Sequence, residues 1–121
     1  MSTLDRNSSS PTSATWRPGY SLPAHFYTSP EVFQADLDLL FSRQWTLVGC
    51  AAEIPEPGDV RRVDIGSTSM LLVRDDDEEV RVLHNVCRHR GSRLVSEDAT
   101  SVGRLICPYH QWSYDLTGEL V

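Results

Sequence analysis

Four residues in the last third of the 121-residue sequence have the types and the spacing of metal ligands. They form two pairs, Cys87-x-His89 and Cys107-x-x-His110, which are separated by 17 residues. Zinc sites with two cysteines and two histidines usually pair like with like, as C-x2–4-C and H-x3–5-H. Here each pair contains one cysteine and one histidine. This arrangement favours an iron–sulfur cluster with two inequivalent irons, one bound by both cysteines and the other by both histidines.

The segments around the ligands also suit such a cluster. Two ferric ions, two sulfides and two thiolates sum to zero charge, so a cluster with two histidines is less negative than an all-cysteine cluster and has a higher potential. Arg88, Arg90 and Arg93 would stabilise the reduced cluster, or they are ordinary surface residues. Gly91 suits a tight loop with a positive φ or a close approach of the backbone to a sulfide. Pro108 fixes the chain beside a ligand.

The ligand pairs are predicted to lie in loops that follow short β-strands. After Trp45 the sequence alternates β-like runs with turn signals, which predicts a mainly β architecture. Turns are expected at 55–59 and in the acidic run Asp75–Glu79, whose side chains should be solvated. The expected strands are 46–50, 60–65, 69–74, 80–85, 104–107 and 112–115, with a last strand beginning at Glu119.

One helix is predicted ahead of the strands. Ser29 suits the N-cap, Pro30 the first helical position and Glu31 the first turn. An apolar stripe with helical periodicity follows, formed by Phe33, Leu37, Leu40 and Phe41. Residues 1–22 are rich in Ser, Thr and Pro and are expected to be a disordered tail.

Five further residues are candidates for a role in or near the site. His84 lies in a strand just before the first pair and is either a structural histidine or an outer-shell residue. His25 is expected to face solvent or to pack on the domain. Cys50 has no partner at metal-ligand spacing and is expected to be a buried packing residue. Trp112 and Tyr114 alternate on a strand beside the second pair, where they either shield the cluster or belong to the core.

Two segments resemble a known family. NVCRHRGSRL (85–94) and CPYHQWSYDLTGEL (107–120) are similar to the cluster loops of the large subunits of Rieske non-haem iron oxygenases. These enzymes include the ring-hydroxylating dioxygenases and the monooxygenases that attack quaternary amines. The resemblance covers residues 22–121, and Gln111 replaces the glycine of the family's usual CPYHGW. It implies a Rieske 2Fe-2S cluster bound by Cys87, His89, Cys107 and His110.

The resemblance also implies a domain organisation. Residues 1–22 would be the disordered tail and residues 23–44 a lead-in helical segment. Residues 45–121 would form a Rieske domain, a small antiparallel β-sandwich with two cluster-binding loops. This domain is expected to be truncated, because the strands that complete the family's sheet are missing after residue 121.

The function implied by the resemblance is electron transfer. A reductase or ferredoxin would donate the electron, and a mononuclear iron in a catalytic domain or a separate subunit would accept it. That iron needs two histidines and a carboxylate, and only His25 and His84 remain for it. No oxygen-activating site is therefore expected in this chain, and its status as an enzyme stays open. The alternatives are a stand-alone Rieske ferredoxin and a non-catalytic zinc-binding module.

Composition excludes several other classes of function. The net charge of −6 argues against nucleic acid as a partner. No apolar run approaches the roughly 18 residues that span a bilayer, and the N-terminus lacks the apolar region of a secretory signal. Three unevenly spaced cysteines are a poor disulfide framework. These features predict a cytoplasmic protein without a membrane partner, and a homo-oligomer is considered.

Overall fold

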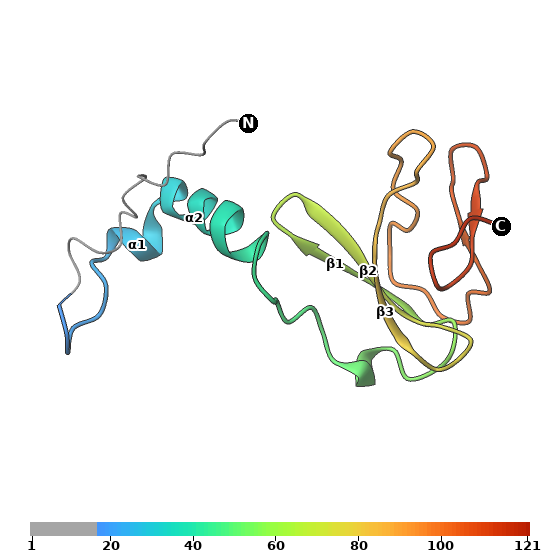
Figure 1. The fold of residues 1–121 in the computed structure, drawn as a ribbon, viewed down its shortest axis with the longest axis horizontal. Coiled ribbons are helices and arrows are strands. Elements are labelled where there is room, and N and C mark those ends of the chain that lie inside the picture. The colour runs from blue at the N-terminus through green and yellow to red at the C-terminus, as the bar shows by residue number, and fades with distance from the viewer. Residues whose placement is uncertain (1–16) are drawn as a thin grey trace, which may run out of the picture. The chain divides into compact units, whose positions relative to one another are not determined.

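The computed structural model of the protein describes residues 17–121, which belong to two compact units. The first unit ends at Gln44 and is helical, whereas the second runs from Trp45 to Val121 and contains the strands (Figure 1). Of the predicted tail, residues 1–16 lie outside the described part of the chain. Among residues 17–121, no helix is long and apolar enough to cross a membrane.

The helical unit confirms the predicted start of the helix. The Ser29 hydroxyl accepts a hydrogen bond from the Val32 amide at 3.3 Å, and this bond satisfies an amide that the first helical turn leaves without a partner. A short helix that was not predicted precedes this cap, and the main helix ends in a π-helical turn. The elements are α1 (His25–Thr28), α2 (Pro30–Asp36) and η1 (Leu37–Phe41). Three side chains of the apolar stripe are exposed: Phe33, Leu40 and Phe41.

The β unit is built on a three-stranded antiparallel sheet with the order β1-β2-β3. The strands confirm three of the predicted runs, and β2 lies in the centre of the sheet. Its side chains Leu71 and Val73 are fully buried as a result. The strands are β1 (Val60–Ile65), β2 (Thr68–Arg74) and β3 (Val80–His84).

A second, two-stranded antiparallel sheet pairs β4 (Leu105–Ile106) with β5 (Ser113–Tyr114). Both strands are shorter than predicted because the loop that joins them begins at residue 107. After β5 the chain turns back, and Leu120 forms a single β-bridge with Tyr114. This bridge lies where a last strand was predicted to begin, at Glu119. The predicted antiparallel, mainly β fold class is confirmed.

Residues 46–50 form no strand, so the prediction for this run is wrong. The amide of Cys50 donates to the Glu53 carboxylate at 2.8 Å, and the run leads into a short 3-10 helix, η2 (Ala51–Glu53). A strand is stabilised by a ladder with a neighbouring strand, which local alternation of apolar residues does not guarantee. Leu47 is 91% exposed and Cys50 is exposed as well. The predicted packing role of Cys50 is therefore wrong too.

The acidic turn between β2 and β3 contains one buried carboxylate. Asp75 accepts hydrogen bonds from the amides of Asp77 at 3.0 Å and Glu79 at 2.8 Å, and from the Arg81 guanidinium at 2.7 Å. The bond from Arg81 outweighs desolvation and lowers the pKa of Asp75 below its ordinary value. Residues 76–79 are exposed, as predicted, but Asp75 is only 1% exposed. Asp75 braces the turn, so the prediction that it is solvated is wrong.

Both sheets and both predicted ligand pairs contribute to one hydrophobic core. Cys87 and Cys107 are each 2% exposed and pack among strand residues. The positions at which the ligand loops begin are therefore fixed by core packing. The other core side chains are Val60, Leu71, Val73, Leu105, Tyr114 and Leu116.

Candidate metal centre

The first ligand loop (residues 87–92) follows β3 and closes on its own cysteine. The Cys87 amide donates to the Ser92 carbonyl at 2.7 Å, and the Gly91 amide donates to the Cys87 carbonyl at 2.9 Å. Gly91 has a φ of +71°, in the left-handed region where glycine has no steric penalty. The predicted positive φ at Gly91 is confirmed.

The second ligand loop (residues 107–112) joins β4 to β5 and repeats both hydrogen bonds. The Cys107 amide donates to the Trp112 carbonyl at 2.8 Å, and the Gln111 amide donates to the Cys107 carbonyl at 2.9 Å. Gln111 has a φ of +60°. Because a residue with a Cβ atom pays about 1 kcal/mol or more in this region, Gln111 occupies a position that suits glycine.

The two loops place Cys87 and Cys107 in the same buried cluster. The Tyr114 hydroxyl lies 3.3 Å from the Cys87 sulfur and accepts a hydrogen bond from the Arg88 amide at 3.0 Å. The hydroxyl proton is therefore available to the sulfur. This hydrogen bond lowers the pKa of the Cys87 thiol and raises the pKa of Tyr114. The site thus favours a thiolate at Cys87, which is the form that binds metals.

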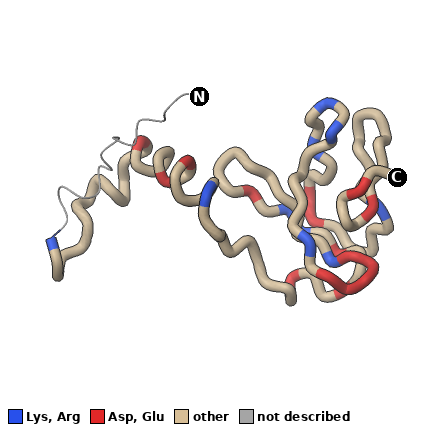
Figure 2. The backbone as a smooth tube through the Cα atoms, in the orientation of Figure 1, with Lys and Arg blue, Asp and Glu red and all other residues tan. Residues whose placement is uncertain are grey.

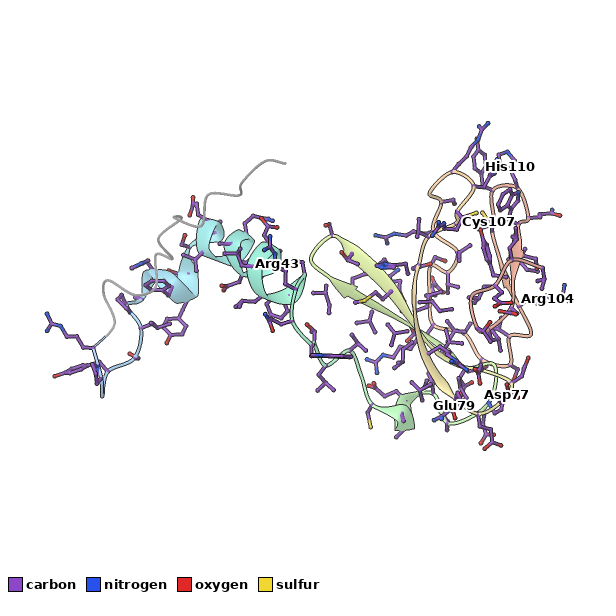
Figure 3. All side chains as sticks on the ribbon, in the orientation of Figure 1. Arg43, Asp77, Glu79, Arg104, Cys107 and His110 are labelled. Carbon is purple, nitrogen blue, oxygen red and sulfur yellow. The ribbon has the colours of Figure 1, made fainter. Side chains whose placement is uncertain are left out.

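The two histidines form a second pair, at the surface. Nδ1 of His89 lies 3.2 Å from Nδ1 of His110. Two nitrogens bound at about 2.1 Å to one tetrahedral metal ion are about 3.4 Å apart, so the imidazoles are spaced as a chelating pair. Both histidines are exposed, and Figure 3 shows His110 at the top of the view with Cys107 below it.

The four predicted ligands therefore form two pairs, each of a single residue type. The sulfurs form a buried pair and the imidazoles an exposed pair. Among residues 17–121, no three His, Cys, Asp or Glu side chains surround a position for a single metal ion. A 2Fe-2S cluster of the Rieske type requires two cysteines on one iron and two histidines on the other. The two pairs fit this requirement.

The second ligand loop supplies an aromatic neighbour to each imidazole. Trp112 stacks on His89 with ring centroids 4.8 Å apart and an interplanar angle of 9°. Tyr109 lies against His110 with centroids 3.8 Å apart. Trp112 is half-buried against the core, and Tyr114 is a core residue that also contacts Cys87. The predicted core packing of Trp112 and Tyr114 is therefore observed, and shielding of a cluster by these rings stays a prediction.

Asn85 is a supporting residue that sequence reasoning missed. Its amide oxygen accepts from the amides of Leu94 at 2.9 Å and Val95 at 3.0 Å, and its NH2 group donates to the Val95 carbonyl at 2.7 Å and the Ser69 hydroxyl at 3.2 Å. Asn85 is 3% exposed. These bonds join the two ends of the segment that contains the first ligand loop. The available signal was an asparagine two residues before the first ligand, since a short amide side chain commonly hydrogen-bonds nearby backbone groups.

The other candidate residues have no bond to the ligand pairs in the described part of the chain. His84 is exposed at the end of β3, where it faces Met70 in the ladder. His25 is exposed and lies against Phe26, with ring centroids 4.4 Å apart. Cys50 is exposed in the segment that precedes η2.

Residues 44–121 match a known protein family, described as the Rieske [2Fe-2S] domain. The chain belongs to this family. The match includes both ligand loops and covers the β unit. The predicted family and the predicted cofactor, a Rieske 2Fe-2S cluster, are confirmed.

Relatives of this Rieske chain are large subunits of oxygenases. It is 44% identical over 102 residues to the glycine betaine monooxygenase oxygenase subunit of Chromohalobacter salexigens, with 84% of this chain and 23% of the relative covered. It is 43% identical over 100 residues to the large oxygenase component of salicylate 5-hydroxylase from a Ralstonia species, with 82% and 24% covered. The chain thus spans about a quarter of the length of these relatives.

Solved structures agree with this assignment. The quaternary ammonium Rieske monooxygenase CntA in complex with γ-butyrobetaine is 32% identical, with a TM-score of 0.73, and the alignment covers 82% of this chain and 28% of that one. Naphthalene 1,2-dioxygenase from a Rhodococcus species is 35% identical, with a TM-score of 0.74 and coverage of 82% and 22%. The chain has the Rieske domain of a ring-hydroxylating-type oxygenase large subunit.

Proposed function

We propose that Cys87 and Cys107 bind one iron of the cluster and that His89 and His110 bind the other. The observation that carries this proposal is the division into a buried sulfur pair and an exposed imidazole pair with Nδ1 atoms 3.2 Å apart. When bound, a Rieske cluster accepts and releases one electron at a time. The function that follows is a single-electron relay.

The surrounding residues prepare the site for this relay. Tyr114 directs its hydroxyl at the Cys87 sulfur and joins β5 to the first ligand loop through the Arg88 amide. Core packing keeps water from the sulfurs, because both cysteines are buried. Trp112 fixes the plane of the His89 ring by stacking. The exposed imidazole edge is where electrons enter and leave.

We further propose the direction of the relay. A reductase or a ferredoxin donates the electron, and a mononuclear iron in an oxygenase catalytic domain or subunit accepts it. The names of the relatives support this direction, because they are oxygenase subunits of which this chain covers about a quarter. The alternative of a stand-alone ferredoxin has no such support. The relatives act on quaternary amines and on aromatic compounds, so the oxygenase served would belong to one of these two substrate classes.

Two further predictions concern the cellular compartment and the oligomeric state. Cys50, Cys87 and Cys107 form no disulfide with one another, which supports a reducing compartment such as the cytoplasm. Assembly as a homo-oligomer stays a prediction.

The relay is tested by reconstituting the chain with iron and sulfide and following its visible and EPR spectra during stepwise reduction. One electron per chain should be taken up, and the reduced form should give the rhombic EPR signal of a Rieske centre. The reduced chain should return to its oxidised spectrum when an electron acceptor is added. A chain that binds one zinc ion and no labile sulfide would refute the proposal in favour of the zinc module.

A further inference from the structure

A cavity of about 250 Å³ lies between the end of β3, the first ligand loop and the two-stranded sheet. Three leucines form much of its wall: Leu83 from β3, Leu94 after the ligand loop and Leu105 from β4. Tyr114 from β5 also lines it, and like Leu105 it is a buried core residue. The lining includes none of the four cluster ligands. The cavity is therefore a neighbour of the metal centre and separate from it.

The size and the walls of the cavity suit one ring. An apolar cavity of about 150 Å³ is large enough to bind benzene, so this cavity can hold a ring with a small substituent. The leucines offer apolar contacts, and Tyr114 offers an aromatic ring. Aromatic rings attract one another in offset and edge-to-face pairs beyond the effect of the area that they bury. The walls therefore favour an aromatic ligand.

Arg88 brings a positive charge to the cavity. It lines the cavity and is exposed, and none of the described residues in the lining is acidic. The ion pairs within residues 17–121 involve Arg61, Arg62 and Arg81 and leave out Arg88. A guanidinium presents paired N–H donors whose spacing matches a carboxylate. Arg88 can therefore bind the carboxylate of a ligand whose ring lies among the leucines.

The surrounding charge distribution also favours an anion. The segment 85–96 has three arginines and no acidic residue, and the segment 105–114 has no charged residue. Five consecutive acidic residues form the turn Asp75–Glu79. Figure 2 shows this acidic turn at one end of the β unit and the arginines of the first ligand loop at the other. A positive local field raises the concentration of anions at a site.

We propose that this cavity binds a small aromatic carboxylate, with its ring among the leucines and its carboxylate on Arg88. We also propose that the bound anion weakens the affinity of the cluster for its electron. The binding site does not depend on the relay, whereas the effect on the cluster rests on the proposed function.

Tyr114 connects the cavity to the metal centre. It lines the cavity, and its hydroxyl lies 3.3 Å from the Cys87 sulfur and accepts a hydrogen bond from the Arg88 amide at 3.0 Å. The oxidised cluster is neutral by the charge count given above, and the reduced cluster has one negative charge. A carboxylate beside Tyr114 therefore disfavours the reduced form. By linkage, reduction of the cluster weakens binding of the carboxylate by the same factor.

Binding is tested by titration calorimetry of the oxidised, cluster-loaded chain with three probes. Benzoate has both the ring and the charge, and its Kd should be at or below about 1 mM. Benzyl alcohol keeps the ring without the charge, and acetate keeps the charge without the ring. Both should bind at least about tenfold more weakly than benzoate, because each lacks one of the two contacts.

Two arginine variants locate the charge. R88Q should weaken benzoate binding by about tenfold and leave benzyl alcohol binding unchanged. R90Q is the matched control, since Arg90 is an exposed arginine of the same loop that does not line the cavity. It should leave the affinity for benzoate close to that of the parent chain.

A variant that fills the cavity locates the ring. Val86 lines the cavity and is 40% exposed, so a larger side chain can be placed there without disturbing the core. V86F should weaken binding of benzoate and of benzyl alcohol alike. Its visible spectrum, compared with that of the parent chain, reports whether the cluster is retained.

The effect on the cluster is tested by protein-film voltammetry with and without saturating benzoate. The midpoint potential should fall, by about 59 mV for each tenfold difference in benzoate affinity between the oxidised and reduced chains. Calorimetry of the reduced chain measures that difference independently. R88Q should remove the shift at the benzoate concentration that saturates the parent chain, and R90Q should retain it.

The possible outcomes separate the two parts of the proposal. Benzoate binding no tighter than that of benzyl alcohol, or an R88Q variant that behaves like R90Q, would overturn the carboxylate site. The cavity would then be a purely apolar groove, suited to a side chain of a partner protein. Saturable binding with an unchanged midpoint potential would overturn the effect on the cluster. A chain without a redox-active cluster would refute the relay, and benzoate calorimetry on that chain would still decide the binding site.

Discussion

The two ligand loops share a backbone pattern and differ in most of their side chains. In each loop the cysteine is hydrogen-bonded to the fourth and fifth residues that follow it, and the fourth residue is left-handed. The histidine is the second residue after Cys87 but the third after Cys107. Because the pattern is closed by residues beyond the histidine, the ligand spacing can differ by one residue without altering the loop.

The side chains of the two ligand loops have different roles. The first ligand loop is basic and is held from outside, by Asn85 before it and by Tyr114 from β5. The second ligand loop has no charge and supplies the aromatic rings that flank both imidazoles. The comparison indicates that the common backbone positions the ligands. The side chains that differ hold the first loop in place and flank the two imidazoles.

Loss of either cysteine should have the largest effect, and it should be equal in the two loops. Cys87→Ser and Cys107→Ser each leave one iron with a single thiolate. We expect the content of iron and labile sulfide per chain to fall by more than about tenfold. Cys50→Ser is the matched control, because Cys50 is exposed and lies outside both loops. A Cys87 or Cys107 variant with full cluster content would show that the wrong thiols were assigned.

Removal of Asn85, which anchors the first ligand loop, should cause the next largest effect. Asn85→Ala leaves the amides of Leu94 and Val95 without their buried partner, and we expect the free energy of unfolding to fall by about 3 kcal/mol. Chemical denaturation of the cluster-loaded chain measures this change. The counterpart after the second loop is Asp115→Ala, which removes acceptors for Thr117 and Glu119 at a less buried position. It should cost clearly less, and equal losses would contradict the difference between the anchors.

Substitutions at the left-handed residues, Gly91 and Gln111, should change the stability by smaller amounts and with opposite signs in the two loops. Gly91→Ala places a Cβ atom in open space, so its cost is conformational alone, about 1 kcal/mol. Gln111→Gly relieves the same penalty and should stabilise the chain by a similar amount. Thermal melts should show shifts of about 4–8 °C per kcal/mol in a domain of this size. A destabilised Gln111→Gly variant would mean that the Gln111 side chain makes contacts that outweigh its strain.

The smallest expected effect is a pH dependence of stability that arises at Asp115, after the second ligand loop, and not at Asn85. Hydrogen bonds from the Thr117 hydroxyl and the Glu119 amide lower the pKa of Asp115. A lowered folded-state pKa gives stability that is complete above the unfolded value near pH 4 and is lost as the pH falls through the folded value. The difference in unfolding free energy between the parent chain and Asp115→Asn should therefore be constant above about pH 4 and shrink below it. The Asn85→Ala difference should stay flat, since an amide does not titrate. A loss that begins well above pH 4 would contradict the lowered pKa.

The parts of the molecule that were predictable from sequence are those specified locally. The Ser29-Pro30 helix start, the strands of the first sheet, the positive φ of Gly91 and the family of the ligand loops all depend on neighbouring residues or on motif spacing. The false strand at 46–50 shows the limit of this reasoning, because a strand also needs a partner that local alternation does not supply. The buried carboxylate of Asp75 was missed for a related reason: its partner Arg81 lies on the next strand. Asn85 was missed because its partners lie on the other side of the ligand loop, at Leu94 and Val95, and on β2, at Ser69.

The central claim is that the imidazole pair and the thiolate pair bind different irons of one cluster. Pulsed EPR of the reduced chain measures it most directly, because nitrogen ligands couple magnetically to the cluster. Two nitrogen couplings are predicted, one from His89 and one from His110. They should remain in His84→Ala, which changes an exposed histidine outside the site, and they should be lost with the Rieske signal in His89→Ala and His110→Ala. A reduced cluster without nitrogen coupling, or one that keeps both couplings in His89→Ala, would contradict the claim.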